Sequence, residues 1–440
     1  MSASDRGAAP PLCRDVRCRV YGVVMVDNVE SPQPAVHRPS TISEVAELVR
    51  RASQEAVPLT VVSGGHGPWS HGAEPGIRLE LGELASIEVD GTAVRVGGGA
   101  VWGDVAATLA AHGLALSSGD TASVGVGGLT LGGGVGWMVR AWGLAADQLV
   151  GAQVVTASGE VVETSTAEHP DLFWALRGGG GNFGVVTRFD FQAHRLPGIA
   201  LSESVVEADA AAVLRAARDV LRDAPRELTV TYMDVPPMDP SAPAGARLTA
   251  VWAAPDAEAL RAILEPISSL DGVRTEVTEP AYRDILMEMP QPEGDDAPAP
   301  PGFIGGNGLF ADLDDDLIER LVAFRRDYPA SVVFLRSLGG AFGDVPQEQT
   351  AFPARSATWF VMAGAFDIPG MLDDAARATV TADTERIVAG RLAEYGNFAD
   401  TERPDAVPGM FAPEAFQRLR EVKALWDPQN VFRRNHNIVV

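Results

Sequence analysis

Ser63-Gly64-Gly65-His66-Gly67 follows a short apolar run, 58–62, and places a histidine inside a glycine loop. Two more glycine-dense stretches come later, at 119–137 and 177–186. Because glycine has no Cβ, consecutive amides can take positive φ angles and form a concave nest for an anion. Three such loops in this order predict a backbone wrapped around an extended anionic ligand. Tight turns between strands also use glycine, and this simpler interpretation stays open for any single loop.

The histidine of the first loop, His66, predicts a cofactor that is bonded to the protein. A neutral imidazole is nucleophilic enough for such a bond. Two alternatives stay open. His66 can be a loop residue with a structural hydrogen bond, or His71, later in the same loop, can be the bonded histidine.

Composition limits the class of protein. The chain has 440 residues, 46% of them hydrophobic, which predicts two or three folded domains. The formal net charge of −24 argues against nucleic acid and anionic membranes as partners. No apolar run reaches the roughly 18 residues that span a bilayer, and the N-terminus lacks the pattern of a secretory signal. Cys13 and Cys18 predict free thiols in a reducing cytoplasm, with one small disulfide as the alternative.

The first 197 residues predict helices and strands around the glycine loops. Thr41-Ile-Ser-Glu44 has the spacing of a capping box, so we expect a helix to begin there. Asp90-Gly91 between apolar runs predicts a hairpin. A helix is expected over 100–112, and one long strand over 183–195.

After residue 198 the glycine clusters end. Helical patterns at 208–222 and 257–270 alternate with strand-like runs, which predicts a second domain with an antiparallel sheet. The segment Met287–Gly302 is rich in Pro, Asp and Glu, so we expect a surface loop, with a lid as one option. A last helix is expected over 413–425, followed by a polar Asn/His cluster near the end of the chain.

These motifs resemble the FAD-linked oxidases of the vanillyl-alcohol-oxidase type, and within them the berberine-bridge-enzyme-like group with a single flavin bond. The match is dense over 38–197 and good over 395–438. The resemblance implies an α+β fold: a two-subdomain FAD-binding domain plus an α/β substrate domain with an antiparallel sheet. The expected bounds are 1–197 for the FAD domain, 198–392 for the substrate domain, and 393–440 for a segment that returns to the FAD domain.

The resemblance also implies the site. His66 would be bonded through an imidazole nitrogen to the 8α-methyl group of FAD, and no metal is implied. Tyr395 and Asn397 would lie beside the flavin ring as catalytic residues, and Val124 would leave dioxygen a path to it. Further FAD-binding residues are implied in the three loops and the tail: Ser63, Gly64, Gly65, Gly67, Gly119, Thr121, Gly125, Val126, Gly127, Gly128, Gly132, Gly134, Asn182, Gly184, Val186, Asn435 and Asn437.

The chain departs from the family pattern at two positions. Thr121 stands where many relatives have a cysteine that forms a second flavin bond, so one bond is expected. Phe398 stands where sugar and alcohol oxidases of the group have a proton-accepting tyrosine, and a phenyl ring accepts no proton. An amine, or a substrate ionised by another group, therefore becomes the favoured substrate. Asp344 and Glu348 are further acidic candidates in the second domain, or else solvated surface charges.

The resulting expectation is an FAD-dependent oxidase. Hydride would pass from a small-molecule substrate to flavin N5, and O2 would reoxidise the flavin and give H2O2. Tailoring of a secondary metabolite, or oxidation of an amine or alcohol, fits this expectation. The alternatives are a flavin dehydrogenase unreactive with O2 and a non-catalytic FAD-binding protein. The sequence predicts no oligomeric state.

Overall fold

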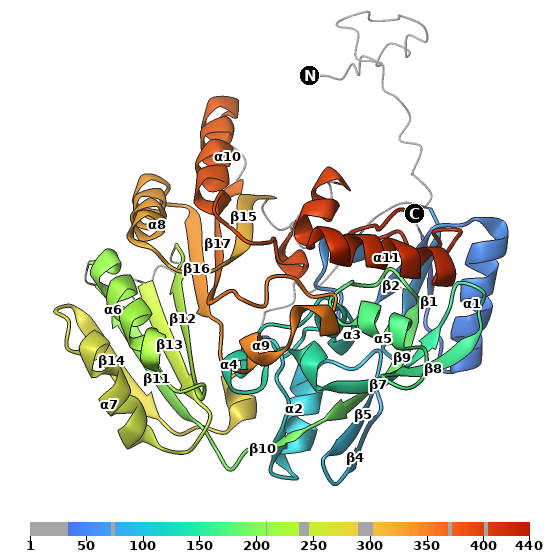
Figure 1. Cartoon of the computed structure of the whole chain (residues 1–440), viewed down its shortest axis with the longest axis horizontal. Coiled ribbons are helices and arrows are strands. Elements are labelled where there is room, and N and C mark those ends of the chain that lie inside the picture. The colour runs from blue at the N-terminus through green and yellow to red at the C-terminus, as the bar shows by residue number, and fades with distance from the viewer. Residues whose placement is uncertain are drawn as a thin grey trace, which may run out of the picture.

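A computed structural model describes residues 34–71, 75–207, 209–236, 246–288, 302–367, 372–399 and 404–440. Cys13 and Cys18 lie outside the described residues. Figure 1 shows two halves: the N-terminal part of the chain together with the C-terminal tail, and a second half built from the middle of the chain. We use "tail" for residues 393–440.

The chain enters the first half through a small parallel sheet. Its strand order is β1 (Ala35–His37), β3 (Ile77–Glu80) and β2 (Leu59–Val62). Helix α1 (Ile42–Glu55) begins after the expected capping box, which is confirmed: the Thr41 hydroxyl accepts from the Glu44 amide at 3.3 Å. The glycine loop with His66 leaves β2 directly, so the sheet sets where the loop begins.

A five-stranded antiparallel sheet forms the rest of this half. The strand order is β4 (Ile87–Asp90), β5 (Ala93–Gly97), β9 (Val185–Gln192), β7 (Leu149–Val155) and β8 (Val161–Ser165). The expected hairpin at Asp90-Gly91 is confirmed, with a φ of 61° at Gly91. The strand expected over 183–195 is divided, because β9 ends at Gln192 and β10 (His194–Arg195) pairs instead with β6 (Leu114–Ala115).

Five helices among the described residues flank this sheet. They are α2 (Trp102–Ala110), α3 (Val126–Leu131), α4 (Val139–Trp142), α5 (Pro170–Leu176) and, from the tail, α11 (Pro413–Trp426). Helix α11 lies next to α5, so the end of the chain packs against the first half (Figure 1). Buried side chains from the sheet, from α2 and α5, and from α11 form one hydrophobic core.

The second half is a seven-stranded sheet whose recorded pairings are all antiparallel, as expected. The order is β14 (Val273–Thr278), β11 (Ala200–Val206), β13 (Ala246–Trp252), β12 (Leu228–Asp234), β16 (Ser331–Ser337), β17 (Trp359–Asp367) and β15 (Gly302–Phe310). One face is covered by α6 (Ala210–Asp223), α7 (Ala257–Ser268), α8 (Asp315–Asp327) and α10 (Asp374–Val388) (Figure 1). The other face turns toward the first half, and we call this sheet the roof. Of the expected loop Met287–Gly302, residues 289–301 lie outside the described ones.

Buried arginines join the two halves. Arg140 of α4 donates to the carbonyl oxygens of Leu228 at 2.7 Å and Leu338 at 2.5 Å, both in the middle of the chain. Arg355 pairs with Asp147 of the first half at 2.7 Å, and both side chains are almost completely buried. Both arginines form charge-assisted hydrogen bonds that are buried away from water. These bonds hold the roof in a fixed position over the first half.

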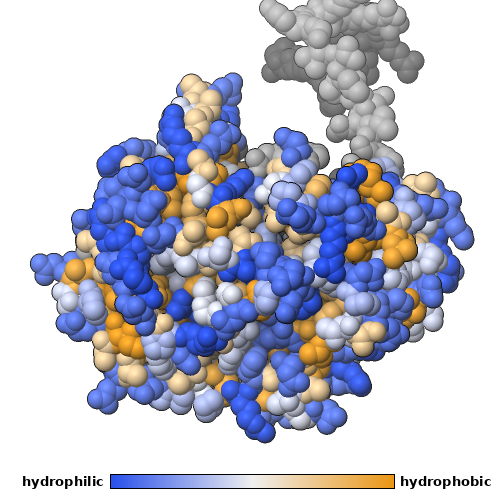
Figure 2. Space-filling view, in the orientation of Figure 1, coloured by the Kyte–Doolittle hydropathy of each residue, from blue (hydrophilic) through white to orange (hydrophobic). Residues whose placement is uncertain are grey.

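The surface fits the strongly negative composition. Figure 2 shows hydrophilic residues over most of one face, with hydrophobic ones in small scattered groups. Within the described ranges, no helix combines the length and the apolar character needed to cross a bilayer.

Candidate active site

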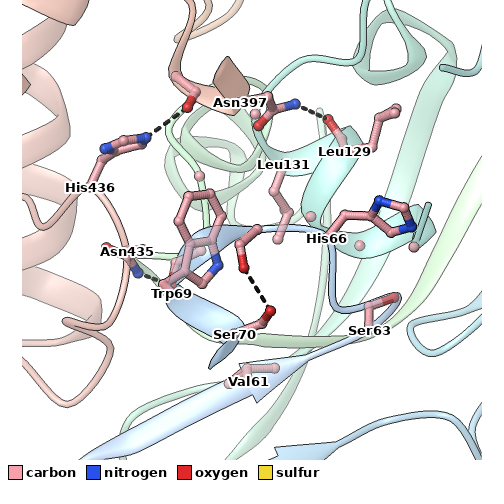
Figure 3. A pocket seen from close by; sticks show the side chains of 18 of the residues that line it. Val61, Ser63, His66, Trp69, Ser70, Leu129, Leu131, Asn397, Asn435 and His436 are labelled. Carbon is pink, nitrogen blue, oxygen red and sulfur yellow. Dashed lines mark hydrogen bonds between the residues drawn. The ribbon is translucent and has the colours of Figure 1, made fainter. Parts of the chain in front are cut away.

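A cavity of about 490 Å³ lies where the three glycine loops meet Phe352 and Pro353 of the second half and the tail (Figure 3). The structure brings most of the predicted site residues together around it: Ser63, Gly64, Gly65, His66, Gly67, Gly119, Thr121, Val124, Gly125, Gly127, Gly128, Gly132, Asn182, Gly184, Val186, Tyr395, Asn397 and Asn435 all line the cavity. These residues come from segments more than 300 positions apart in the chain, so the cavity forms only when the tail docks.

The first and second loops touch backbone to backbone. A Cβ added at Gly64 would lie 2.2 Å from the amide nitrogen of Gly125, and one added at Gly125 would lie 2.4 Å from the Ser63 hydroxyl oxygen. Any side chain at Gly64 would therefore push the loops apart. Glycine is required here because the two chains approach closely.

The third loop is fixed to the second in a similar way. The amides of Gly178 and Gly180 both donate to the Leu131 carbonyl at 3.0 Å. Gly178 takes a φ of 120° and Gly180 a φ of 73°, which are angles that residues with side chains rarely adopt. Phe352 of the second half blocks any Cβ at Gly178, since its amide nitrogen would lie only 2.3 Å away.

His66 stands at the wall of the cavity with an exposed side chain. Its Nε2 atom lies 2.9 Å from the Ser123 hydroxyl of the second loop, so the ring is oriented by a hydrogen bond. Figure 3 shows His66 and Trp69 of the first loop around the cavity, together with Asn397 and Asn435 of the tail. The side chain of His71, the alternative considered from the sequence, lies outside the described part of the structure.

A fully buried lysine ties the tail to the third loop. Lys423 of α11 donates to the Asn182 carbonyl at 2.8 Å, to the Phe432 carbonyl at 3.0 Å and to the Asp427 carboxylate at 2.6 Å. Burial lowers the pKa of the Lys423 ammonium, and the Asp427 carboxylate opposes this shift. The Asp427 carboxylate also accepts the Phe432 amide at 2.9 Å. This network places the last residues of the chain beside the cavity.

The asparagines of the tail and third loop have mixed roles. The Asn182 side chain donates to the Gly179 carbonyl at 3.0 Å and accepts from the Ile438 amide at 3.0 Å, so it joins loop and tail. Asn435 donates to the Gly181 carbonyl at 3.0 Å. Its Oδ1 atom is buried and accepts no hydrogen bond from the described residues, and the same holds for the Ser63 hydroxyl. Buried polar atoms are normally paired, so these two indicate a polar ligand in the cavity.

Tyr395 and Asn397 form one wall. The Tyr395 hydroxyl oxygen accepts from the Gly134 and Val135 amides, each at 3.2 Å, and from Asn397 Nδ2 at 2.9 Å. Burial raises the pKa of the Tyr395 phenol, although these donors oppose the shift. Phe398, three residues later, is 50% exposed and lines the cavity. The turn therefore presents the phenyl ring to the cavity and directs the hydroxyl of Tyr395 toward backbone amides.

Three predicted cofactor residues do not line the cavity. Val126 is fully buried in the hydrophobic core, because it starts helix α3 with its side chain turned inward. Gly134 contributes its amide to Tyr395, as described above. Asn437 is not among the residues that line the cavity. Its Oδ1 atom is buried and has no hydrogen-bond partner among the described residues.

The sequence-based analysis missed several lining residues. Asp120, Trp69, Phe352 and Arg434 also face the cavity. Asp120 is a polar residue inside the second glycine stretch, and that position is the signal that could have revealed it. The acidic candidates Asp344 and Glu348 are both exposed and do not line the cavity, and Asp344 pairs with Arg226 at 2.7 Å.

The arrangement fits an elongated dinucleotide such as FAD. Side-chain-free loops line one part of the cavity, which allows amides to approach a diphosphate closely. Orphaned acceptors at Ser63 and Asn435 provide polar contacts, and apolar side chains such as Val124 and Phe398 provide surface for a planar ring. The residues present therefore fit the group that the sequence pattern implied.

Comparison with known proteins supports this interpretation. A family model described as "FAD binding domain" matches residues 33–165, and one described as "Berberine and berberine like" matches residues 394–439. The chain is 40% identical over 202 residues to (R)-6-hydroxynicotine oxidase of Paenarthrobacter nicotinovorans, a stretch that covers 44% of each protein. It is 30% identical over 436 residues to the FAD-linked oxidoreductase OXR1 of Pyricularia oryzae, covering 90% of this chain and 82% of that one.

Among solved structures, the chain is similar to glucooligosaccharide oxidase from Acremonium strictum, which carries a 6-S-cysteinyl, 8α-N1-histidyl FAD. The TM-score is 0.79 at 25% identity, over 92% of both chains. Sequence and fold therefore agree over nearly the whole length. The protein binds FAD and belongs to the FAD-linked oxidoreductases of the berberine-bridge-enzyme-like family.

Proposed function

We propose that the protein is an oxidase that takes hydride from a small-molecule substrate and uses O2 as the final acceptor. FAD held by the glycine loops would supply the hydride acceptor and the reduction of O2 to H2O2. The observation that carries the proposal is the single cavity in which the glycine loops, His66 and the Tyr395 wall converge. The proposal is supported by two oxidases, one similar to this chain in sequence and the other similar in fold.

We also propose that His66 holds FAD by a covalent bond to the 8α-methyl group. His66 lines the cavity with an exposed side chain, and the Ser123 hydroxyl lies 2.9 Å from its Nε2 atom and orients the ring in the loop. The similar glucooligosaccharide oxidase carries a histidyl bond and a second, cysteinyl bond. Thr121 lines the cavity at the position where that group of relatives has a cysteine, so one bond is expected here.

The substrate side of the cavity favours an amine over a sugar. Phe398 presents a phenyl ring where a proton-accepting hydroxyl would be needed for a simple alcohol. Tyr395 and Asn397 shape this wall through their mutual hydrogen bond. Tailoring of a small secondary metabolite is the role we assign to this chemistry, and the name of one relative, a hydroxynicotine oxidase, supports a nitrogen-containing substrate.

Acid denaturation tests the covalent bond. We expect the acid-precipitated protein to stay yellow and its intact mass to exceed the chain mass by one FAD. His66→Ala should give a colourless precipitate and the bare chain mass. His436→Gln is the matched control, because His436 also lines the cavity and should leave the bond intact. Acid-stable flavin in His66→Ala would show that another residue forms the bond.

A further inference from the structure

Asp120 places a carboxylate in the wall of the cavity. It follows Gly119 in the second glycine stretch and precedes Thr121, and all three residues line the cavity. Its Oδ2 atom accepts a hydrogen bond from Arg336 Nη2 of the roof strand β16 at 2.6 Å. The contact joins the first half of the molecule to the roof.

The position of this carboxylate is fixed from two directions. Arg336 is 2% exposed, donates from Nε to the Thr231 hydroxyl at 2.9 Å, and has its guanidinium 4.5 Å from the Trp137 ring centroid. On the other side, the Asp120 carbonyl accepts from the Met287 amide at 2.7 Å. Both side chain and backbone of Asp120 are therefore held before any ligand enters.

One carboxylate oxygen of Asp120, Oδ1, is not used by the hydrogen bond to Arg336. Within the described ranges, no protein group donates a hydrogen bond to Oδ1, and the side chain is 19% exposed. Glu394 is the other carboxylate among the described lining residues, but its side chain is 3% exposed and pairs with Arg391 at 3.1 Å. Asp120 is thus the carboxylate with an available acceptor in the cavity.

Aromatic side chains line the same cavity as Asp120. Phe398 is half exposed on the cavity side, with its ring centroid 5.2 Å from that of Phe360 and 5.7 Å from that of Tyr395. The Asp120 carboxylate contributes to the raised pKa of the Tyr395 phenol, after burial as the main cause, so its field reaches this wall. An aromatic surface beside a fixed carboxylate matches a ligand with a ring and a cationic group.

We propose that Asp120 determines specificity by binding a cationic nitrogen of an aromatic amine substrate through its Oδ1 atom. The inference rests on the proposed function, since it assigns the substrate class of that same cavity. Arg336 neutralises part of the charge on the carboxylate, but it bonds only Oδ2 and leaves the geometry of a second, charge-assisted hydrogen bond intact. A neutral hydroxyl could form only an ordinary hydrogen bond to Oδ1, which is weaker than the charge-assisted bond to a cationic nitrogen.

Two matched probes test this assignment under anaerobic conditions at neutral pH: benzylamine, which is cationic, and benzyl alcohol, its neutral counterpart. Binding is followed by the change that each probe causes in the absorption spectrum of the protein-bound flavin. We expect the wild-type protein to bind benzylamine about tenfold or more tightly than benzyl alcohol. Asp120→Asn, which keeps the acceptor for Arg336, should abolish this preference and leave benzyl alcohol binding unchanged.

Asp147→Asn is the control, because Asp147 also pairs with a buried arginine between the two halves but does not line the cavity. It should keep the preference for the amine. Equal binding of the two probes by the wild type, no spectral response to benzylamine, or an amine preference that survives in Asp120→Asn overturns the inference. Flavin content is measured in every sample, because a protein without bound FAD would contradict the proposed function instead.

Discussion

Tyr395 and Phe398 belong to one short turn and have ring centroids 5.7 Å apart, yet their exposure differs sharply. The sequence motif 395–398 indicated that this segment borders the flavin, and the segment does line the cavity. Which side chain faces the ligand could not be predicted, because a 3-10 turn over Gly396–Phe398 decides it. In the structure Phe398 is 50% exposed, whereas Tyr395 is 2% exposed and directed at backbone amides.

The Tyr395 hydroxyl should matter for stability. Tyr395→Phe removes the acceptor of the buried Gly134 and Val135 amides and of Asn397, so we expect the free energy of unfolding to fall by about 1–3 kcal/mol. Urea denaturation of the flavin-loaded protein measures this. Glu348→Gln is the control: Glu348 is exposed, and its substitution should change stability by less than about 0.5 kcal/mol. Equal stability of Tyr395→Phe and wild type would mean that the hydrogen bonds to the hydroxyl contribute nothing.

The buried phenol of Tyr282 should make the folded protein less stable in alkaline solution. Burial is the main cause that raises the pKa of its phenol to about 12, while its hydroxyl lies 3.2 Å from the Ser118 hydroxyl. In the unfolded chain a tyrosine ionises near pH 10, so the stabilisation is fully present below about pH 10 and is lost as the pH rises toward 12. Between pH 8 and 11 this one group should cost about 1.4 kcal/mol of unfolding free energy, most of it above pH 10.

Urea denaturation at pH 8, 10 and 11 checks the sign and size of this effect. Tyr282→Phe should be less stable than wild type at pH 8 if its hydrogen bond contributes, but its stability should fall less steeply above pH 10. Parallel curves for the two proteins would show that Tyr282 ionises in the folded state as easily as in the unfolded one.

At the scale of elements, strong local patterns predicted the structure well. The capping box at Thr41 and the hairpin at Asp90-Gly91 are confirmed, and helix α11 differs from its expected range by one residue. These features depend on neighbouring residues alone. The division of the strand expected over 183–195 depends instead on β6, which lies far away in the sequence.

Strand β15 shows where such patterns fail. Its sequence, Gly302–Phe310, is rich in glycine and lacks the apolar alternation of a strand, so no strand was expected there. The glycines are explained by tertiary packing: a Cβ at Gly308 would lie 2.6 Å from the Arg391 side chain, and one at Gly306 would lie 3.2 Å from Val388 at the end of α10. Only the folded neighbourhood makes these residues suitable for a strand.

The contact between the first two glycine loops should be essential for FAD binding. Gly64→Ala would place a Cβ 2.2 Å from the Gly125 amide nitrogen, so the loops must separate and the cavity must change shape. We expect the variant to be purified with less than a tenth of the wild-type flavin. Gly82→Ala is the control, because nothing lies within 4 Å of its added Cβ and Gly82 does not line the cavity. The absorbance ratio of flavin to protein measures occupancy, and full occupancy in Gly64→Ala would contradict the close-approach argument.

At the scale of the whole molecule, the cavity forms where the first half, the second half and the tail pack together. Most of the site residues indicated by sequence motifs do line the cavity, because glycine loops and the Tyr395 motif are local signals. Phe352 was missed because it comes from the second half and reaches the cavity only through the packing of the two halves, whereas Asp120 was overlooked within the second glycine stretch. The cross-links made by Arg140, Arg336 and Arg355 hold that arrangement, and none of them is visible as a pattern in the sequence.

The oxygen reaction also belongs to the whole molecule, because it needs a path through the assembled cavity. Val124 lines that cavity from the second loop, and its side chain is only partly buried. A larger side chain at this position should narrow the access to the flavin. We therefore expect Val124→Leu to bind FAD normally and to slow reoxidation by O2 by about tenfold or more, which corresponds to at least 1.4 kcal/mol in the barrier.

Reoxidation of the reduced protein tests the central claim, that this FAD-linked oxidoreductase is an oxidase. The purified yellow protein is photoreduced without oxygen, mixed with air-saturated buffer in a stopped-flow instrument, and followed by the return of flavin absorbance together with H2O2 formation. The account predicts that the colour returns within seconds and that one H2O2 appears for each flavin. A reduced protein that stays pale in air for many minutes would contradict the account and identify a dehydrogenase.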